Sequence, residues 1–191
     1  MKSSFSAEEF VEIVSKRILS LQTISFGLVM SVVLFFALIL ALTFLQSPQI
    51  PSPQKQASQL SELKLFSMVN AILLSSSFMM AFLLPHFSSQ KRLLSLRQYQ
   101  DKEPLYESAL QIFRASLILK LALLEGSALF GLVVCFLGSQ AGTLQKTPVF
   151  WLNAFPSLVF ILIWIFAFPN KARLQHWFEF QVRPVLEESI V

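Results

Sequence analysis

The feature that most constrains the fold is the spacing of the charged residues. No charged side chain occurs between Arg17 and Lys55, between Lys64 and Lys91, between Glu125 and Lys146, or between Lys146 and Lys171. A soluble domain spreads its charges, because each element needs a solvated face, and about 25% of its residues are charged. In this chain 14% of the residues are charged and 54% are hydrophobic. Four uncharged blocks of this length predict four helices that cross a bilayer, each needing about 20 apolar residues.

The predicted spans cover about residues 21–45, 65–84, 115–137 and 149–168. They lie in a single membrane domain, residues 1–191, because a chain of this length is short for two domains. The segment 46–62 is polar and contains three prolines, which predicts an extended loop. Pro85 closes the second span, and the charged segment 86–114 predicts a cytoplasmic loop that includes an interfacial helix. Pro156 predicts a kink within the fourth span.

Both ends of the chain show amphipathic patterns. Ser6 and Glu9 have the spacing of a helix-capping box, and apolar residues then recur at helical spacing. A second pattern covers about residues 170–189. We therefore expect an interfacial helix at each end of the chain, lying against the membrane surface. The residues that form the two apolar faces are Phe10, Val14, Ile18 and Leu21, and then Leu174, Trp177, Phe178 and Val182.

The distribution of lysine and arginine predicts the orientation. These residues are concentrated before the first span, in the 86–114 segment and after the fourth span, whereas the other two connections are poor in them. The prediction is a multi-pass membrane protein with both termini in the cytoplasm. The net charge of +4 then favours anionic lipid headgroups as the counter-charge, and not nucleic acid, because the cations flank apolar spans. The cations of the three rich segments are Lys2, Lys16, Arg17, Lys91, Arg92, Arg97, Lys102, Arg114, Lys171, Arg173 and Arg183.

Glu125 is the unusual residue of the spans. It lies ten residues into the third one, which puts its carboxyl roughly 15 Å deep. A charged carboxylate there costs about 3 kcal/mol or more, so we expect the side chain to face the bundle or to be protonated. Its predicted hydrogen-bond partners are Asn70 in the second span or Asn153 in the fourth, and Ser77 shares a helix face with Asn70. These four residues form the candidate intramembrane polar site.

Small residues surround Glu125 in two rows at helical spacing. Ala122 and Gly126 form one row, and Ser127 and Gly131 belong to the other. Small residues at this spacing allow helix backbones to approach closely. The sequence therefore predicts that both rows lie at helix-packing contacts.

The motifs of most enzyme classes are missing from the sequence. It has no glycine-rich phosphate loop, no cluster of metal ligands and no nucleophile paired with a base. The single Cys135 excludes an internal disulfide. We therefore expect no catalytic residues, no metal and no cofactor, and a protein that is not an enzyme.

Two blocks of the sequence carry a resemblance to known proteins. "ALLEGSALFGLVVCFL" and "AFPNKARLQHWFE" resemble a group of small bacterial four-helix integral membrane proteins to which no activity is assigned. The first block is also faintly similar to the carboxylate helix of rotary ATPase proteolipid subunits. Those subunits are short hairpins, and the basic central segment and amphipathic ends of this chain depart from their pattern. The resemblance implies an all-α bundle in the inner membrane of a bacterium, and no particular activity.

Two functional hypotheses follow. The first is a non-enzymatic scaffold or subunit of a membrane assembly, either as a homo-oligomer or with another membrane protein. The alternative is a small transporter or channel subunit that uses Glu125 for proton or cation coupling. Proton relays usually chain several ionisable groups, and no second acidic residue lies within the predicted spans. The first hypothesis is therefore the preferred one.

Overall fold

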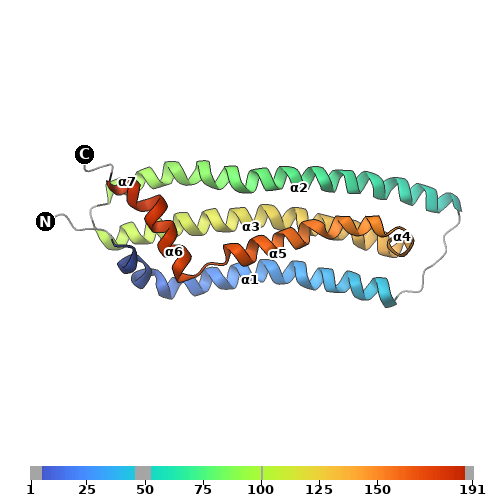
Figure 1. The fold of residues 1–191 in the computed structure, drawn as a ribbon, viewed down its shortest axis with the longest axis horizontal. Helices are drawn as coiled ribbons and strands as arrows, with labels where there is room; N and C mark the ends of the chain where they lie inside the picture. Colours follow the sequence, from blue (N-terminus) through green and yellow to red (C-terminus); the bar gives the residue numbers. More distant parts are fainter. Residues whose placement is uncertain (1–5, 46–52, 100, 188–191) are drawn as a thin grey trace. The chain divides into compact units, whose positions relative to one another are not determined.

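A computed structural model describes residues 6–45, 53–99 and 101–187 of the chain. Of these residues 95% are helical, and none is in a strand. Figure 1 shows the elements in chain order. They are α1 (Ala7–Leu45), α2 (Pro53–Ser95), the 3-10 turn η1 (Leu96–Gln98), α3 (Lys102–Gln140), α4 (Thr143–Lys146), the 3-10 helix η2 (Pro148–Ala154), α5 (Phe155–Ala167), α6 (Lys171–Trp177), the π-helical turn η3 (Phe178–Val182) and α7 (Arg183–Glu187).

In the described part of the chain, four helical stretches are long and apolar enough to cross a membrane. They are Arg17–Leu45, Ala57–Gln98, Lys102–Gln140 and Pro148–Ala167. Each overlaps one of the four predicted spans. The all-helical class and the four apolar helices predicted from the sequence are therefore confirmed at the level of length and composition.

The helices extend well beyond the predicted spans. α2 continues through Pro85 to Ser95, and α3 begins at Lys102, so most of the expected 86–114 loop is helical. Pro85 lacks a backbone N–H and its ring crowds the carbonyl of Ala81, which weakens one turn of the helix. Leu93 and Leu96 are buried beyond that turn, and their packing offsets the weakness.

The polar segment after the first span also differs from the prediction. Residues 53–62 form the start of α2 and not an extended loop, with Pro53 at its first position. A proline is tolerated there, because the first N–H groups of a helix have no partner within the helix. Residues 46–52 of the expected loop lie outside the described residues, as do Lys2 and the last residues of the 170–189 segment.

The chain divides into two compact units, which are described separately. Unit 1 comprises residues 1–26, 82–120 and 167–191, and unit 2 comprises residues 27–81 and 121–166. The sequence predicted a single domain.

The core of unit 1 joins the two amphipathic ends of the chain. The rings of Phe10 and Phe178 stack at 4.6 Å between centroids, and Tyr106 meets each of them edge-on at 5.6 Å. All three side chains are fully buried. The prediction placed the two apolar faces against the membrane surface. In the structure they cover each other, because their helical spacing serves equally well for packing on protein. The core residues are Ala7, Phe10, Val14, Ile18, Leu93, Leu96, Leu105, Tyr106, Ala109, Leu110, Ile112, Leu174, Phe178, Val182 and Leu186.

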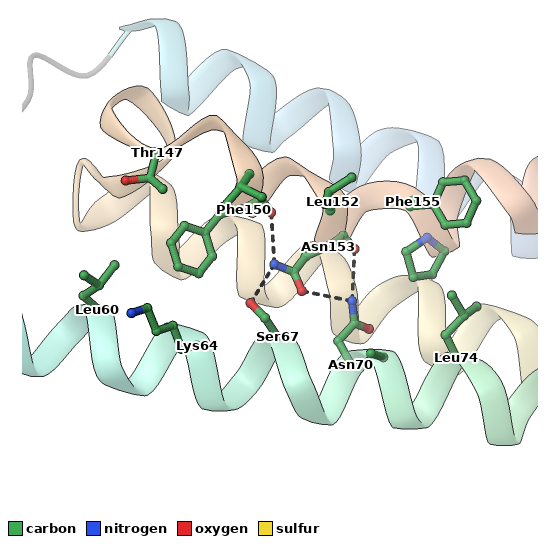
Figure 2. Close-up of a pocket in the computed structure, with 13 residues that line it drawn as sticks. Leu60, Lys64, Ser67, Asn70, Leu74, Thr147, Phe150, Leu152, Asn153 and Phe155 are labelled. Atoms are coloured by element: carbon green, nitrogen blue, oxygen red, sulfur yellow. Dashed lines mark hydrogen bonds between the residues drawn. The ribbon is translucent and has the colours of Figure 1, made fainter.

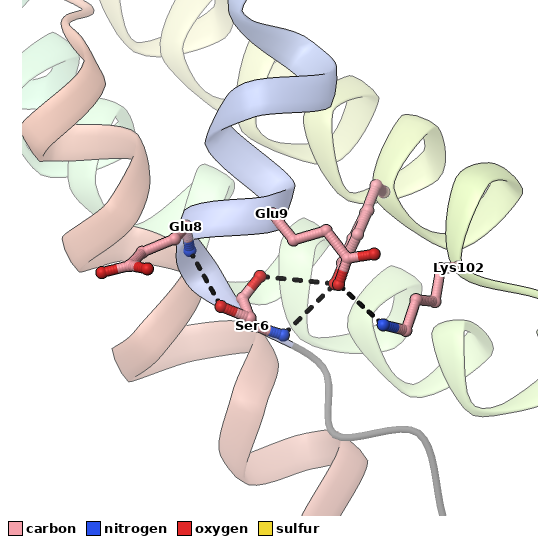
Figure 3. Close-up of polar contacts among 5 residues, drawn as sticks. Ser6, Glu8, Glu9 and Lys102 are labelled. Atoms are coloured by element: carbon pink, nitrogen blue, oxygen red, sulfur yellow. Dashed lines mark hydrogen bonds and ion pairs between the residues drawn. The ribbon is translucent and has the colours of Figure 1, made fainter.

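The start of α1 is held by contacts with α3. The hydroxyl of Ser6 accepts a hydrogen bond from the backbone N–H of Glu8 at 3.3 Å, and the Ser6 N–H donates to the hydroxyl of Tyr106 at 3.3 Å (Figure 3). Glu9 does not complete the expected capping box and instead forms an ion pair with Lys102 at 2.7 Å. Burial raises the pKa of Tyr106, which lies outside the apolar segment 115–137, to about 12.

In unit 2, side-chain hydrogen bonds join the end of α1 to α3 and α4. The hydroxyl of Thr43, near the end of α1, lies 2.9 Å from the hydroxyl of Ser139 on α3. The amide of Gln145, on α4, donates to the backbone oxygen of Thr43 at 2.8 Å and so satisfies a carbonyl that has no partner within the helix. Gly142 forms the turn between α3 and α4 with φ of 64°, a conformation that glycine adopts without steric cost.

Candidate functional site

Two asparagines meet in unit 2. The side-chain amide of Asn70 on α2 donates to the backbone oxygen of Asn153 at 3.3 Å and to its side-chain oxygen at 3.2 Å. The amide of Asn153 on η2 donates to the hydroxyl of Ser67 at 2.9 Å and to the carbonyl of Phe150 at 3.0 Å (Figure 2). Because the neighbours of both amide nitrogens are acceptors, the network itself fixes the orientation of the two amides. We call these three polar side chains, Ser67, Asn70 and Asn153, the asparagine cluster.

The sequence explains why Asn153 lies on a 3-10 helix. Pro156 has no backbone N–H, so it cannot donate to the carbonyl of Leu152 as an α-helix would require. The N–H of Phe155 donates to that carbonyl instead, which is the tighter 3-10 pattern. At Pro156, where the sequence predicted a kink, the helix changes type, and the proline lies in the first turn of α5.

Gly131 allows α3 to approach η2 closely. A Cβ atom added at this position would overlap the backbone oxygen of Asn153 and would lie 2.9 Å from the amide nitrogen of Asn70. The hydroxyl of Ser157 on α5 also donates to the carbonyl of Ala128 at 3.2 Å. The asparagine cluster thus packs against a stretch of α3 backbone that has no side chain in the way.

A pocket of about 700 Å³ lies beside the asparagine cluster, between α2 on one side and η2 with α5 on the other (Figure 2). The wall is mostly apolar, and Lys64 and Thr147 add polar groups to those of the cluster. The side-chain oxygen of Asn70 is buried and has no hydrogen-bond partner among the described residues. None of the three cluster side chains titrates near neutral pH, so they can position a helix or a ligand through hydrogen bonds but cannot transfer a proton.

Glu125 lies elsewhere in unit 2. Its carboxyl oxygen is 2.6 Å from the hydroxyl of Ser31 on α1. The same hydroxyl is 2.8 Å from the carbonyl of Leu28. The hydroxyl of Ser31 has a single hydrogen, so it donates to only one of these two oxygens at a time. Glu125 is half-buried and Ser31 is exposed.

The predicted contact between Glu125 and an asparagine is not found in the described chain. Gly131 packs against Asn153, and Glu125 precedes Gly131 by six residues, which rotates it about 120° around α3. The carboxyl therefore points toward α1 and away from the asparagine cluster. Ser77 is half-buried two turns beyond Asn70 on α2 and is not part of the cluster.

The two rows of small residues have different surroundings. Ser127 is buried and its hydroxyl donates to the carbonyl of Leu124 at 3.0 Å, and Gly131 is closely packed. Ala122 is exposed, and a Cβ added at Gly126 would meet no atom within 4 Å. The close contact expected of the Ala122 and Gly126 row is thus absent from the described chain, because this row faces outward on the side of Glu125.

Sequence reasoning missed the residues of α1 beside Glu125. Gly27 and Ser31 lie four residues apart, and a Cβ added at Gly27 would also meet no atom within 4 Å. The same small-residue spacing that identified Ala122 and Gly126 would have identified this pair. We call the set Gly27, Ser31, Ala122, Glu125 and Gly126 the Glu125 face.

The described residues hold no group of three or more histidine, cysteine or acidic side chains arranged to bind a metal ion. No family model, no curated protein and no solved structure matches this chain. The functional argument therefore depends on the geometry of the chain itself.

Proposed function

We propose that this chain is a multi-pass membrane protein without enzymatic activity, and that it is a subunit or scaffold of a membrane assembly. Its docking surface is the Glu125 face, and the occupant of that surface is a transmembrane helix of another subunit. The proposed membrane is the bacterial inner membrane, with both termini and the segment that joins α2 to α3 on the cytoplasmic side.

The observation that supports this proposal is a carboxyl group on an open surface of apolar helices. Glu125 is only half-buried, and its neighbour Ser31 is exposed. A polar group facing hydrocarbon costs several kcal/mol in the worst case, and a second helix that covers it removes that cost. Gly27, Ala122 and Gly126 leave room for a helix backbone to come close. Gly131, which is already packed against η2, shows how such a glycine is used within the chain.

The first test is the size of the native complex after gentle extraction in detergent. We expect the wild-type chain to run well above its monomer mass of 21.7 kDa. Gly126→Leu fills the open space on the Glu125 face and should shift the protein to the monomer without changing its helix content. Leu162→Phe is a matched control, since Leu162 is an exposed apolar residue of α5, and should leave the complex intact. A wild-type chain that runs as a monomer, or equal effects of the two variants, would refute the docking proposal.

Co-expression of two differently tagged copies then identifies the occupant. Recovery of one tag with the other indicates a second copy of this chain. If the second tag is not recovered but the complex is still larger than the monomer, the occupant is a different membrane protein.

A second candidate function rests on the 2.6 Å contact between Glu125 and Ser31. A carboxyl that is half-exposed beside a hydroxyl could exchange a proton with a pathway along this face, as a proton-coupled transporter or channel subunit requires. Proton flux into proteoliposomes separates the two functions, because Glu125→Gln keeps the hydrogen-bonding groups but cannot release a proton. The assembly proposal expects no flux for either chain, whereas flux by the wild type that disappears in Glu125→Gln would favour coupling.

The orientation is tested by cysteine labelling in intact cells after Cys135→Ser. Ser95→Cys, at the end of α2, should be protected from an impermeant reagent outside the cell. Ser58→Cys, near the start of α2, should react with it. The opposite pattern would reverse the proposed topology.

A further inference from the structure

Unit 1 contains a pocket whose wall is basic. The pocket encloses about 690 Å³ between α3 and the chain that follows α5. Ser116 and Lys120 line it from α3, and Asn170, Arg173, His176 and Trp177 line it from the other side. None of its lining residues is acidic.

Lys120 and Arg173 have no ion-pair partner among the described residues. Three ion pairs join described residues of unit 1, and they use other cations: Arg17 with Glu107, Lys102 with Glu9, and Arg183 with Glu187. The ammonium of Lys120 lies 4.0 Å from the ring centre of Phe82, a cation–π contact that leaves its charge uncompensated. Arg173 lines the same pocket from α6 and carries the same sign of charge. An anion between the two cations would therefore be attracted to both.

The position of the pocket along the chain indicates the kind of anion. Ala167, the last residue of α5, lines the pocket where the apolar block 149–168 ends. The rings of Phe113 and Trp177 form part of the wall and meet edge-on, 5.2 Å apart. Tryptophan beside basic residues at the end of an apolar helix is typical of the headgroup layer of a membrane. Basic pockets at this level bind the headgroups of anionic lipids.

We propose that this pocket binds one anionic phospholipid, with its phosphate between Lys120 and Arg173. The hydroxyl of Ser116 and the amide of Asn170 are the neutral donors that line the same space. The side-chain oxygen of Asn170 already accepts the N–H of Arg173 at 2.9 Å, so its amide nitrogen is the group that remains to donate to the phosphate. Lipid binding at this site rests on the membrane insertion proposed above and is independent of the Glu125 face.

The test is native mass spectrometry of the full-length protein in detergent, titrated with phosphatidylglycerol, phosphatidylcholine or inorganic phosphate. We expect phosphatidylglycerol to bind the wild type in preference to phosphatidylcholine. Arg173→Gln and Lys120→Gln should each lower the affinity for phosphatidylglycerol by about fivefold, since one basic residue contributes about that factor near an anionic surface. Lys91→Gln removes the same charge from an exposed position of α2 outside the pocket and should leave the affinity unchanged.

Two results would overturn the proposal. The first is an equal loss of affinity in Lys91→Gln and Arg173→Gln, which would show a general charge effect and not a site. The second is inorganic phosphate that binds as tightly as the lipid, which would show an anion site without lipid recognition. Arg173 is exposed, so its variant should fold even if Lys120→Gln does not. Extraction of membranes with alkaline carbonate tests insertion separately, so failure of that premise is distinguishable from failure of the lipid site.

Discussion

Replacing Gly131 by alanine tests the close packing in unit 2 with a single methyl group. The new Cβ would overlap the backbone oxygen of Asn153 and lie 2.9 Å from the amide nitrogen of Asn70. One of these atoms is backbone, so α3 and η2 must move apart. Overpacking of this kind costs about 1–3 kcal/mol, and loss of the hydrogen bond between the asparagines adds about 0.6 kcal/mol. We therefore expect Gly131→Ala to lower the free energy of unfolding by about 1.5–3.5 kcal/mol.

Gly126→Ala is the matched control on the same helix, and the variants are compared as monomers because Gly126 belongs to the proposed docking surface. Its Cβ would meet no atom of the chain within 4 Å, and alanine is the better helix former by about 1 kcal/mol in a soluble helix. Unfolding in detergent, followed by circular dichroism during titration with a denaturing detergent, measures both variants against the wild type. Equal stability of Gly131→Ala and the wild type would refute the close approach of α3 to η2.

Three further predictions concern other parts of the chain. Asn70→Ala leaves the oxygens of Asn153 without their donor and should destabilise the protein in the same assay by about 1 kcal/mol, whereas no change would mean that the asparagine cluster contributes nothing to stability. Lys102→Ala should cost less than about 1 kcal/mol, because its ion pair with Glu9 is about one-third exposed on both sides, and a larger loss would contradict that assignment. For Tyr106, the folded state keeps the proton between pH 10.0 and about 12 while the unfolded chain loses it. The contribution of protonated Tyr106 to stability should therefore be fully present below pH 10.0 and should fall as the pH rises toward 12. Thermal unfolding measures this change, and Tyr106→Phe should remove that part of the pH dependence.

The four apolar helices were predictable because each requires a long block without charges, and such blocks are visible in a single sequence. The ends of the helices were not predictable in the same way. Pro85 is a strong local stop signal, yet α2 continues because Leu93 and Leu96 are buried in the core of unit 1. That burial depends on residues far away in the sequence. The apolar face of Phe10 suits lipid and protein equally, so its spacing alone cannot decide which of them covers it.

Two residues of the candidate site, Asn70 and Asn153, were predictable from the sequence, whereas the partner of Glu125 was not. Asn70 and Asn153 are conspicuous because they are polar residues within apolar blocks, and the structure brings them together. The partner of Glu125 was missed, because a hydrogen bond between helices depends on how far each helix is rotated about its axis. Serine is common in these helices, so nothing in the sequence distinguishes Ser31 from the others. The rotation becomes known only when the packing of Gly131 is known.

Photo-crosslinking from the Glu125 face in native membranes tests the central claim most directly. A benzophenone maleimide attached to Gly126→Cys, in a chain with Cys135→Ser, places the probe in the open space beside Glu125. The same probe on Leu162→Cys reports an exposed position of α5. The proposal predicts a protein adduct well above the 21.7 kDa monomer from position 126 and lipid adducts alone from position 162. Lipid adducts alone from both positions would contradict the claim that another helix covers Glu125.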